Sequence, residues 1–361
     1  PSARLSGTSA SGQAQQGVDR SALRKRGLIM RKFLLAAGIG LWALLCCDVQ
    51  ACSACKVDDV KILFHPGHAQ DGSAPDGYRV GRRGRLPSGV YRWAFDTSFE
   101  YVNHDRVNPS VALEINDRPG GHIHSVMDEW FVRQRIGYAV RDDLEIGLSQ
   151  EYRHLRQSNV EDPLELGHHE FAEGVGDLTF DVNYLIKRQS EDFPVSLSVF
   201  AFVKAPTGKT SERTPSGELF DAENQPGSGS WDGGFGVTAA KQWGAWSASG
   251  SFSFTVKGEG RQEFKQGDVA RLTLTAARKL SAEPLGWKLY PSMALQSAIQ
   301  FQGRDHGEVD RNHGGQFLFA IPGFTAKPLD RLTLSASVPL PIYQEYNGTH
   351  QRQDFGVHFN V

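Results

Sequence analysis

The segment RQDFGVHFNV (352–361) alternates apolar and polar residues up to the last residue of the chain. Its apolar row is Phe355, Val357, Phe359 and Val361, and small or polar residues stand between them. Successive side chains of a β-strand point to opposite faces, so this pattern predicts a strand with one apolar and one polar face. Chain ends usually fray, and a fully patterned end predicts a strand that is held in a sheet.

The composition is more polar than that of most soluble globular proteins. Apolar residues make up 39% of the 361 residues, yet aromatic residues reach 10% and there are 39 glycines. The first 51 residues hold seven Lys or Arg and two Asp or Glu, which leaves 32 basic and 39 acidic residues and a formal net charge of −7. These values argue against helical membrane spans and against a basic nucleic-acid-binding surface, so we expect no nucleic-acid partner.

The first 89 residues show no β-strand pattern and are expected to form three segments. Residues 1–29 are predicted to be an upstream extension, either disordered or mis-annotated. Residues 30–51 combine a basic pair, an apolar run and a small residue at Ala51, which is typical of a secretory signal peptide. Residues 52–89 are expected to be a periplasmic segment or plug, in which Cys52 and Cys55 form a lipid-anchor site or a local disulfide.

Alternating segments follow one another from residue 90 onward. They lie near 91–101, 130–140, 144–152, 178–186, 195–203, 231–237, 246–256, 272–274, 287–301, 317–321, 332–342 and 355–361. Short connections near 141–143 and 242–245 alternate with long polar ones, such as 103–125 and 209–229. About twelve amphipathic strands joined in this way predict an all-β protein: an antiparallel up-and-down outer-membrane β-barrel over residues 90–361.

A soluble β-sandwich is the rival interpretation, because its strands also alternate. Sandwich strands usually have about five or six residues, whereas many runs here exceed ten. Aromatic residues such as Tyr101, Trp130 and Trp246 stand at strand ends, as in the interfacial belts of membrane proteins. We therefore expect a bacterial outer-membrane location, with short turns in the periplasm and long loops outside. The apolar rows, that of Phe317, Phe319 and Ile321 included, are expected to face lipid.

Three glycine-containing motifs lie at predicted strand ends. They are Gly174-Val175-Gly176-Asp177, Pro206-Thr207-Gly208 and Gly227-Ser228-Gly229-Ser230-Trp231-Asp232. Together with residues 337–350, they resemble the outer-membrane proteins of the meta-pathway of phenol degradation. The resemblance covers roughly residues 170–361. It implies a barrel that passes small, often aromatic or hydrophobic, compounds, and it supplies no catalytic residues.

Charged residues stand between the apolar residues of many strands. If the apolar rows face lipid, these charges point into the barrel, where they either select a solute or brace a plugged interior. The candidate pore-lining residues are Arg92, Asp96, Glu100, Arg133, Arg135, Glu145, Glu151, Arg153, Asp181, Lys187, Lys204, Arg271, Lys288 and His358.

No motif predicts an enzyme or a cofactor. His154 and Ser158 are four residues apart, about 13 Å on a strand, which is too far for a nucleophile and its base. The weak metal-ligand candidates are histidines of the predicted outer loops, for which solvated loops are the simpler interpretation. They are His122, His124, His168 and His169.

The sequence therefore predicts an outer-membrane channel for the passive passage of small solutes, such as aromatic or hydrophobic ones. The alternative is a non-conducting scaffold or partner-binding barrel that acts through its extracellular loops. The expected partners are outer-membrane lipid, a small solute and the barrel assembly machinery, which recognises C-terminal strands of this kind. Val361 stands where a terminal Phe is more usual.

Overall fold

The computed structural model describes residues 92–117, 123, 125–160, 166–329, 332–348 and 351–361. The predicted upstream extension, signal peptide and periplasmic segment lie outside these residues, as do Cys52, Cys55, His122 and His124. No helix in the described ranges is long and apolar enough to cross a membrane.

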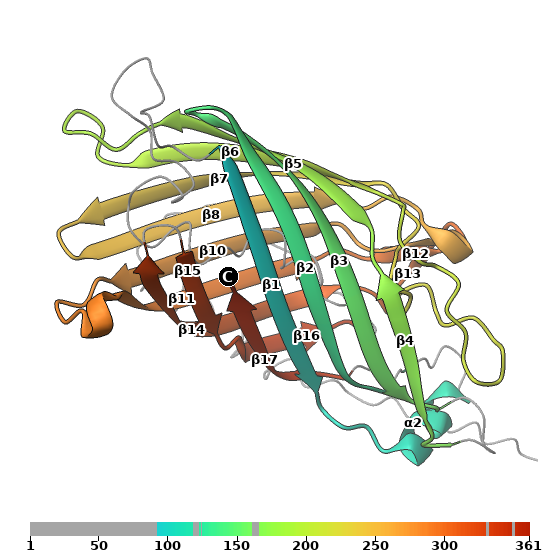
Figure 1. Cartoon of the computed structure of the whole chain (residues 1–361). Helices are drawn as coiled ribbons and strands as arrows, with labels where there is room; N and C mark the ends of the chain where they lie inside the picture. The colour runs from blue at the N-terminus through green and yellow to red at the C-terminus, as the bar shows by residue number, and fades with distance from the viewer. Residues whose placement is uncertain (1–91, 118–122, 124, 161–165, 330–331, 349–350) are drawn as a thin grey trace, which may run out of the picture. The chain divides into compact units, whose positions relative to one another are not determined.

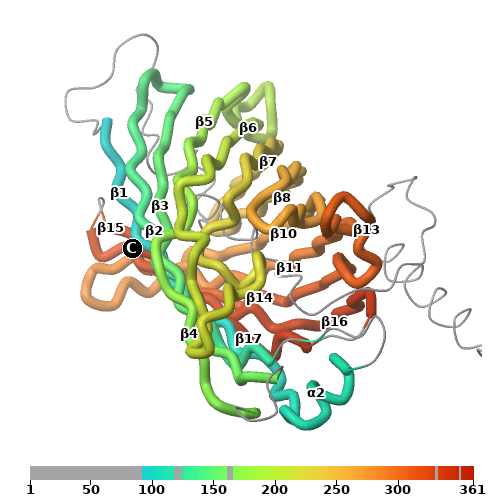
Figure 2. The backbone as a smooth tube through the Cα atoms, turned by 90° about the vertical axis from the view of Figure 1, so that its right-hand side faces the viewer, coloured from blue at the N-terminus to red at the C-terminus, as the bar shows by residue number. Residues whose placement is uncertain are grey.

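Twelve antiparallel strands of the described residues close into a barrel, as predicted (Figure 1). Two of the twelve are interrupted: β4 and β5 both pair with β3, and β15 and β16 both pair with β14. The strands are β1 (Trp93–His104), β2 (Val126–Arg141), β3 (Leu144–Ser158), β4 (His169–Val175) with β5 (Leu178–Lys187), β6 (Ser196–Ala205), β7 (Asp232–Trp243), β8 (Trp246–Val256), β10 (Val269–Arg278), β11 (Lys288–Gln300), β14 (Gly315–Leu329), β15 (Leu332–Ser337) with β16 (Leu340–Tyr346), and β17 (Gln353–Asn360). In Figure 2 the strands from β5 to β14 follow one another around the wall.

The C-terminal segment closes the barrel. β17 pairs with β1 from Ser98↔Asn360 to His104↔Gln353. One residue further, Thr97 and Val361 each donate a backbone hydrogen bond of 2.9 Å to the carbonyl of the other. The patterned end of the chain is therefore a strand held on both sides, because β15 pairs with its other edge.

The two ends of the barrel differ in the length of their connections. At one end, here called the short-turn end, β2 and β3 are joined by residues 142–143, and β7 and β8 by 244–245. The other end, here called the long-loop end, carries the helix α2 (Pro109–Asn116). It also carries the small sheet of β9 (Phe264–Lys265), β12 (Gly303–Asp305) and β13 (Glu308–Asp310) (Figure 1). The predicted alternation of short and long connections is confirmed.

The exposure of side chains alternates along the strands, as expected for a barrel that is surrounded by lipid. The outward rows are apolar and exposed, as at Ile136, Leu148 and Phe180, whereas Ser149 and Asp181 of the inward rows are buried. Outer-membrane barrels have this arrangement because their outer surface meets hydrocarbon and their interior meets water.

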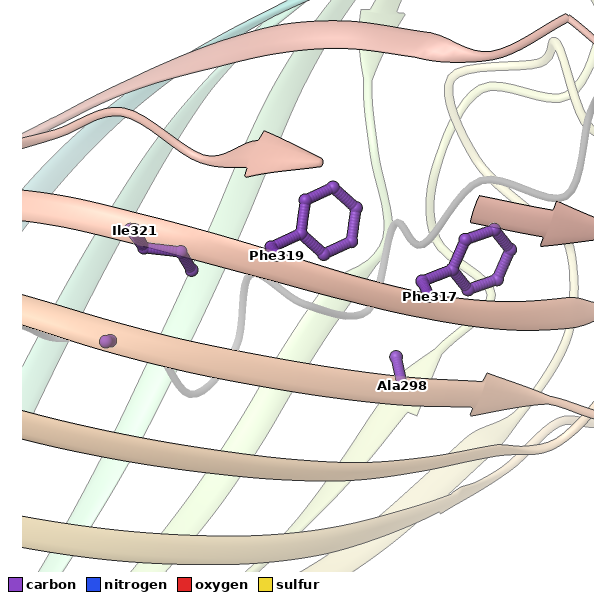
Figure 3. Packing of buried hydrophobic residues seen from close by; sticks show 5 residues of the cluster. Ala298, Phe317, Phe319 and Ile321 are labelled. Carbon is purple, nitrogen blue, oxygen red and sulfur yellow. The ribbon is translucent and has the colours of Figure 1, made fainter. Parts of the chain in front are cut away.

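The expected lipid-facing position of Phe317, Phe319 and Ile321 is wrong. These side chains are 2%, 3% and 2% exposed, and they pack with Ala294 and Ala298 of the neighbouring strand β11 on the inside of the barrel (Figure 3). Both rows of β14 are apolar in this part, since Leu318, Ala320 and Pro322 occupy the other one, so alternation could not tell inside from outside. We call the five buried residues the inner strip.

Aromatic rings also cover part of the inner wall at β6 and β7. A side-chain carbon at Gly234 would meet the ring of Phe202, and one at Gly236 would meet the ring of Phe200. The inward position of both rings explains why β6 shows a blurred alternation in the sequence. Rings over glycines of the neighbouring strand stabilise curved sheets.

We expect the substitution Gly234→Ala to lower the free energy of unfolding by about 1–3 kcal/mol through overpacking. The new methyl group would meet the Phe202 ring and lie 2.9 Å from the carbonyl oxygen of Phe254. Urea titration of the barrel in lipid vesicles measures the loss. Gly233→Ala is the matched control, because its methyl group would meet only the carbonyl oxygen of Phe202 at 3.6 Å. Equal losses in the two variants would show that the ring does not pack on Gly234.

Candidate functional site

One charge cluster of the inner wall is centred on Arg135 of β2. Its guanidinium donates to Asp181 of β5 at 2.7 and 3.0 Å and to Glu145 of β3 at 2.7 Å. Asp96 of β1 lies 3.4 Å away. The structure brings these four predicted residues together. The register pairs Asp96 directly with Arg135, and the guanidinium extends along the wall over Gly147 to reach the other two carboxylates. One cation thus joins three carboxylates from three neighbouring strands.

Other predicted residues form pairs across neighbouring strands. Arg133 of β2 donates to Glu151 of β3 at 2.8 Å. Glu100 of β1 lies 3.2 Å from His358 of β17. Arg271 is buried on β10. The inner wall from β17 to β5 is therefore lined with paired charges.

Three of the predicted residues lie at strand ends instead. Arg92 is exposed and donates to the hydroxyl of Tyr138 at 3.3 Å. Lys187, also exposed, is the last residue of β5 and lies over the Phe193 ring. Lys288 is the first residue of β11. All three belong to the rim at the short-turn end, and we leave them out of the proposed pore lining.

The three sequence motifs meet at Asp177. Its carboxylate accepts hydrogen bonds from the backbone N–H of Gly208 (2.8 Å) and of Ser228 (2.9 Å) and from the Ser228 hydroxyl (2.6 Å). The backbones of Gly208 and Gly227 are in close contact: a side-chain carbon at Gly208 would lie 2.7 Å from the Gly227 Cα. The glycines are therefore required by close approach of two loop segments to the Asp177 carboxylate.

A row of charges continues from Asp177 along the inner wall. Lys204 of β6 lies 3.0 Å from Asp177 and 2.8 Å from Asp232 of β7. Lys257, which follows β8, lies 3.1 Å from Asp232. Of these residues, the sequence identified only Lys204 as an inner residue. Lys257 continues the polar row of β8, and extending that row by one strand position would have found it.

Arg153 connects β3 with the connection between β6 and β7. Its Nη1 donates to the carbonyl oxygens of Glu223 (3.0 Å) and Gln225 (2.7 Å). Its Nη2 lies 3.4 Å from the buried Glu129, and its guanidinium lies over the Phe131 ring. The predicted inner position of Arg153 thus includes a contact to a distant loop that no sequence pattern indicated.

His313, in the connection before β14, lies between two carboxylates. Its Nδ1 is 2.6 Å from Asp310, and its Nε2 donates to Glu223. Burial by itself would lower the pKa of His313, but Glu223 and Asp310 outweigh burial and raise this pKa to about 10. His313 is therefore a cation at neutral pH, although it lies in a buried position.

The weak metal and catalytic alternatives gain no support from the described residues. His168 and His169 are exposed, and no three His, Cys, Asp or Glu side chains of the described ranges are grouped as metal ligands. His154 interacts with Glu173 at 3.0 Å and lies between the rings of Trp130 and Phe171. The absence of an enzymatic activity stays a prediction.

Searches with protein-family models and with the curated proteins match nothing in this chain. Among solved structures, the chain is similar to an outer membrane channel from Pseudomonas putida F1, with 13% identity and a TM-score of 0.52 over 77% of this chain and 98% of that one. The β domain of the Bordetella autotransporter BrkA has 10% identity and a TM-score of 0.42, over 74% and 97% of the two chains. A Pseudomonas aeruginosa FadL homologue has 10% identity and a TM-score of 0.36, over 75% and 89%.

At 13% identity, the likeness to the Pseudomonas putida channel shows the barrel fold. The phenol-degradation resemblance of the motifs stays a prediction. The closed barrel and its apolar outer rows, together with this fold, place the chain in the bacterial outer membrane.

Proposed function

We propose that the chain is an outer-membrane channel for the passive passage of small solutes that combine an aromatic or hydrophobic body with a polar group. The observation that carries this proposal is that one part of the inner wall is charged and another part is apolar. Paired charges line β1, β2, β3 and β5, whereas the inner strip lines β11 and β14 with apolar side chains.

Two further features support the proposal. The barrel fold is shared with a protein described as an outer membrane channel. The inner strip gives the barrel interior an apolar surface that suits the aromatic or hydrophobic part of such a solute. The five side chains of the inner strip are buried in this structure.

The test is the uptake of two anions by proteoliposomes that contain the purified barrel. Benzoate and gluconate carry the same charge, but only benzoate has an aromatic ring. We expect benzoate to enter faster, and we expect Phe319→Ser to slow benzoate more than gluconate because it removes a ring from the inner strip. Leu285→Ser is the control, since Leu285 is 89% exposed in a connection at the short-turn end. Uptake no faster than in protein-free liposomes would contradict the channel, and equal uptake of both anions would contradict the selective role of the strip.

The alternative, a non-conducting scaffold that acts through its loops, is favoured by one observation. One cavity of the charged inner wall near the long-loop end measures about 100 Å³, whereas ligand sites usually measure about 300–1,000 Å³. Shortening the long connections distinguishes the two functions. A scaffold would lose partner binding and would show no permeability either before or after the shortening. A channel would be permeable before the shortening and would keep or increase this permeability.

A further inference from the structure

Residues 211–225, in the connection between β6 and β7, form a compact unit that we call the lobe. Gln225 holds it together from inside. Its Nε2 donates to the carbonyl oxygens of Glu212 (3.0 Å) and Phe220 (2.8 Å), and its Oε1 accepts from the Glu212 N–H (2.9 Å). Because these bonds lie within the lobe, they would survive a displacement of the lobe as a whole.

The lobe contacts the inner wall through an apolar side chain. Phe220 is buried and packs with Val126 of β2, Leu155 of β3 and Ala172 of β4. Leu155 belongs to the same row of β3 as the inward-pointing Arg153. The contact is therefore made inside the barrel, at its long-loop end.

Several polar contacts fix the lobe on separate parts of the barrel. The Asn224 amide donates to the Gln157 side chain of β3 at 3.1 Å, and the Gln262 amide donates to the Phe220 carbonyl oxygen at 3.0 Å.

Two further contacts of the lobe involve charged groups. Arg153 of β3 donates to the carbonyl oxygens of Glu223 and Gln225. On another side, the Glu223 carboxylate accepts from His313, which Asp310 and the Phe264 ring hold in place. β3 and β14 are not neighbours in the sheet, so the lobe bridges wall segments that no strand pairing connects.

The lobe lies against the charged part of the inner wall near the long-loop end. Glu223 and Gln225 of the lobe line a cavity of about 100 Å³ together with Arg133, Glu151 and Arg153 of the wall. The base of the connection is fixed separately, because Gly208 and Ser228 are hydrogen-bonded to Asp177. The lobe can thus swing about a fixed base while every strand pairing of the barrel stays intact.

We propose that the lobe is a movable constriction of the channel, and that the contacts of Arg153 and His313 with residues 223–225 are the latch that holds it closed. This proposal rests on the proposed channel function and adds the segment that limits passage. Release of the latch exposes the charged wall beneath the lobe and widens the path from the long-loop end.

The charge of His313 makes the latch sensitive to alkaline pH. The charged groups that face its ring are Glu223 of the lobe and Asp310 of β13, and its other neighbours, Phe264 and Asn347, are neutral. The pKa of His313 is raised from 6.5 to about 10, so the stability it adds is complete below pH 6.5 and is lost as the pH rises through about 10. We expect the conductance of the wild type to increase when the pH passes about 10, and that of His313→Gln to lack this increase.

The direct test uses a chemical cross-link in the full chain, in which all four native cysteines, Cys46, Cys47, Cys52 and Cys55, are replaced by serine. Cysteines at positions 223 and 313 are joined by a short bis-methanethiosulfonate reagent, which a reductant cleaves. We expect the joined protein to keep a low conductance in planar bilayers, and we expect a several-fold increase after reduction because the native latch is missing. The matched control joins cysteines at positions 213 and 219, a bridged pair within the lobe, and its conductance should not respond to reduction. An unchanged conductance of the 223–313 protein after reduction would overturn the latch.

A second measurement keeps the test independent of conductance. Spin labels at the exposed positions Ser216 and His306 report the distance between the lobe and the turn that joins β12 and β13. We expect Glu223→Gln with His313→Gln to broaden this distance distribution. An unchanged distribution would refute the latch even in a conducting barrel, whereas a broadened distribution without any conductance would refute the channel and retain the moving lobe.

Discussion

Replacing Arg135 with methionine is expected to lower the free energy of unfolding of the barrel by about 3–5 kcal/mol, the usual cost of leaving buried charges without their partner. Arg135 is buried and is the shared partner of Glu145, Asp181 and Asp96. Without it, three carboxylates from three neighbouring strands would lie close together on one part of the inner wall, and their repulsion would act on the pairing of β1, β2, β3 and β5.

Urea titration in lipid vesicles measures this loss, and Arg141→Met is the control. Arg141 pairs with Asp143 at 3.0 Å, but both side chains are largely exposed. Exposed ion pairs contribute about 0–1 kcal/mol, so the control should stay close to the wild type. Arg135→Lys keeps one positive charge but cannot donate to three carboxylates in the same way, and we expect an intermediate loss. Equal stabilities of the Arg135→Met and Arg141→Met variants would contradict the bracing role of the cluster.

The substitution Asp177→Ala is expected to cost about 3 kcal/mol, because it removes one buried charge and the acceptor of several hydrogen bonds. The N–H groups of Gly208 and Ser228 and the Ser228 hydroxyl would lose their acceptor. Lys204 would keep Asp232 as its remaining carboxylate partner among these contacts. The three motifs would then no longer be held at one point.

The same vesicle titration checks this prediction against Asp192→Ala. Asp192 is exposed in a connection at the short-turn end, and surface substitutions of this kind usually stay within about 0.5 kcal/mol. Asp177→Asn should lie between the two, because its amide oxygen still accepts hydrogen bonds while the charge is lost. If Asp177→Ala proved as stable as Asp192→Ala, the junction of the motifs would have no structural role.

The barrel itself could be predicted because period-two alternation and connection lengths are local properties of the chain. The segment 352–361 already contains the closing strand, whose two faces differ clearly. The inner strip could not be predicted in the same way. On β14 both rows are apolar around Phe317 and Phe319, and only the pairing with β11 decides which row points inward.

The charged residues that the strands contribute to the candidate site were predicted from the sequence, whereas those in the connections were not. Arg135 and its three partners follow from strand parity, since all four belong to the polar row of their strands. Glu223 and His313 lie in separate connections, 90 residues apart, and no pattern within either connection indicates that they meet. Asp177 belongs to a motif that is visible in the sequence, but its role depends on two loop segments that only the fold brings to it.

The recording of single channels in planar bilayers tests the central claim most directly. The purified barrel is compared with the variant Glu223→Gln and His313→Gln, in which the latch is released. We predict discrete conductance steps for the wild type and steps of several-fold larger size for the variant. The absence of any conductance in both proteins, and also in a released variant that lacks residues 56–89, would contradict a function in passive solute passage.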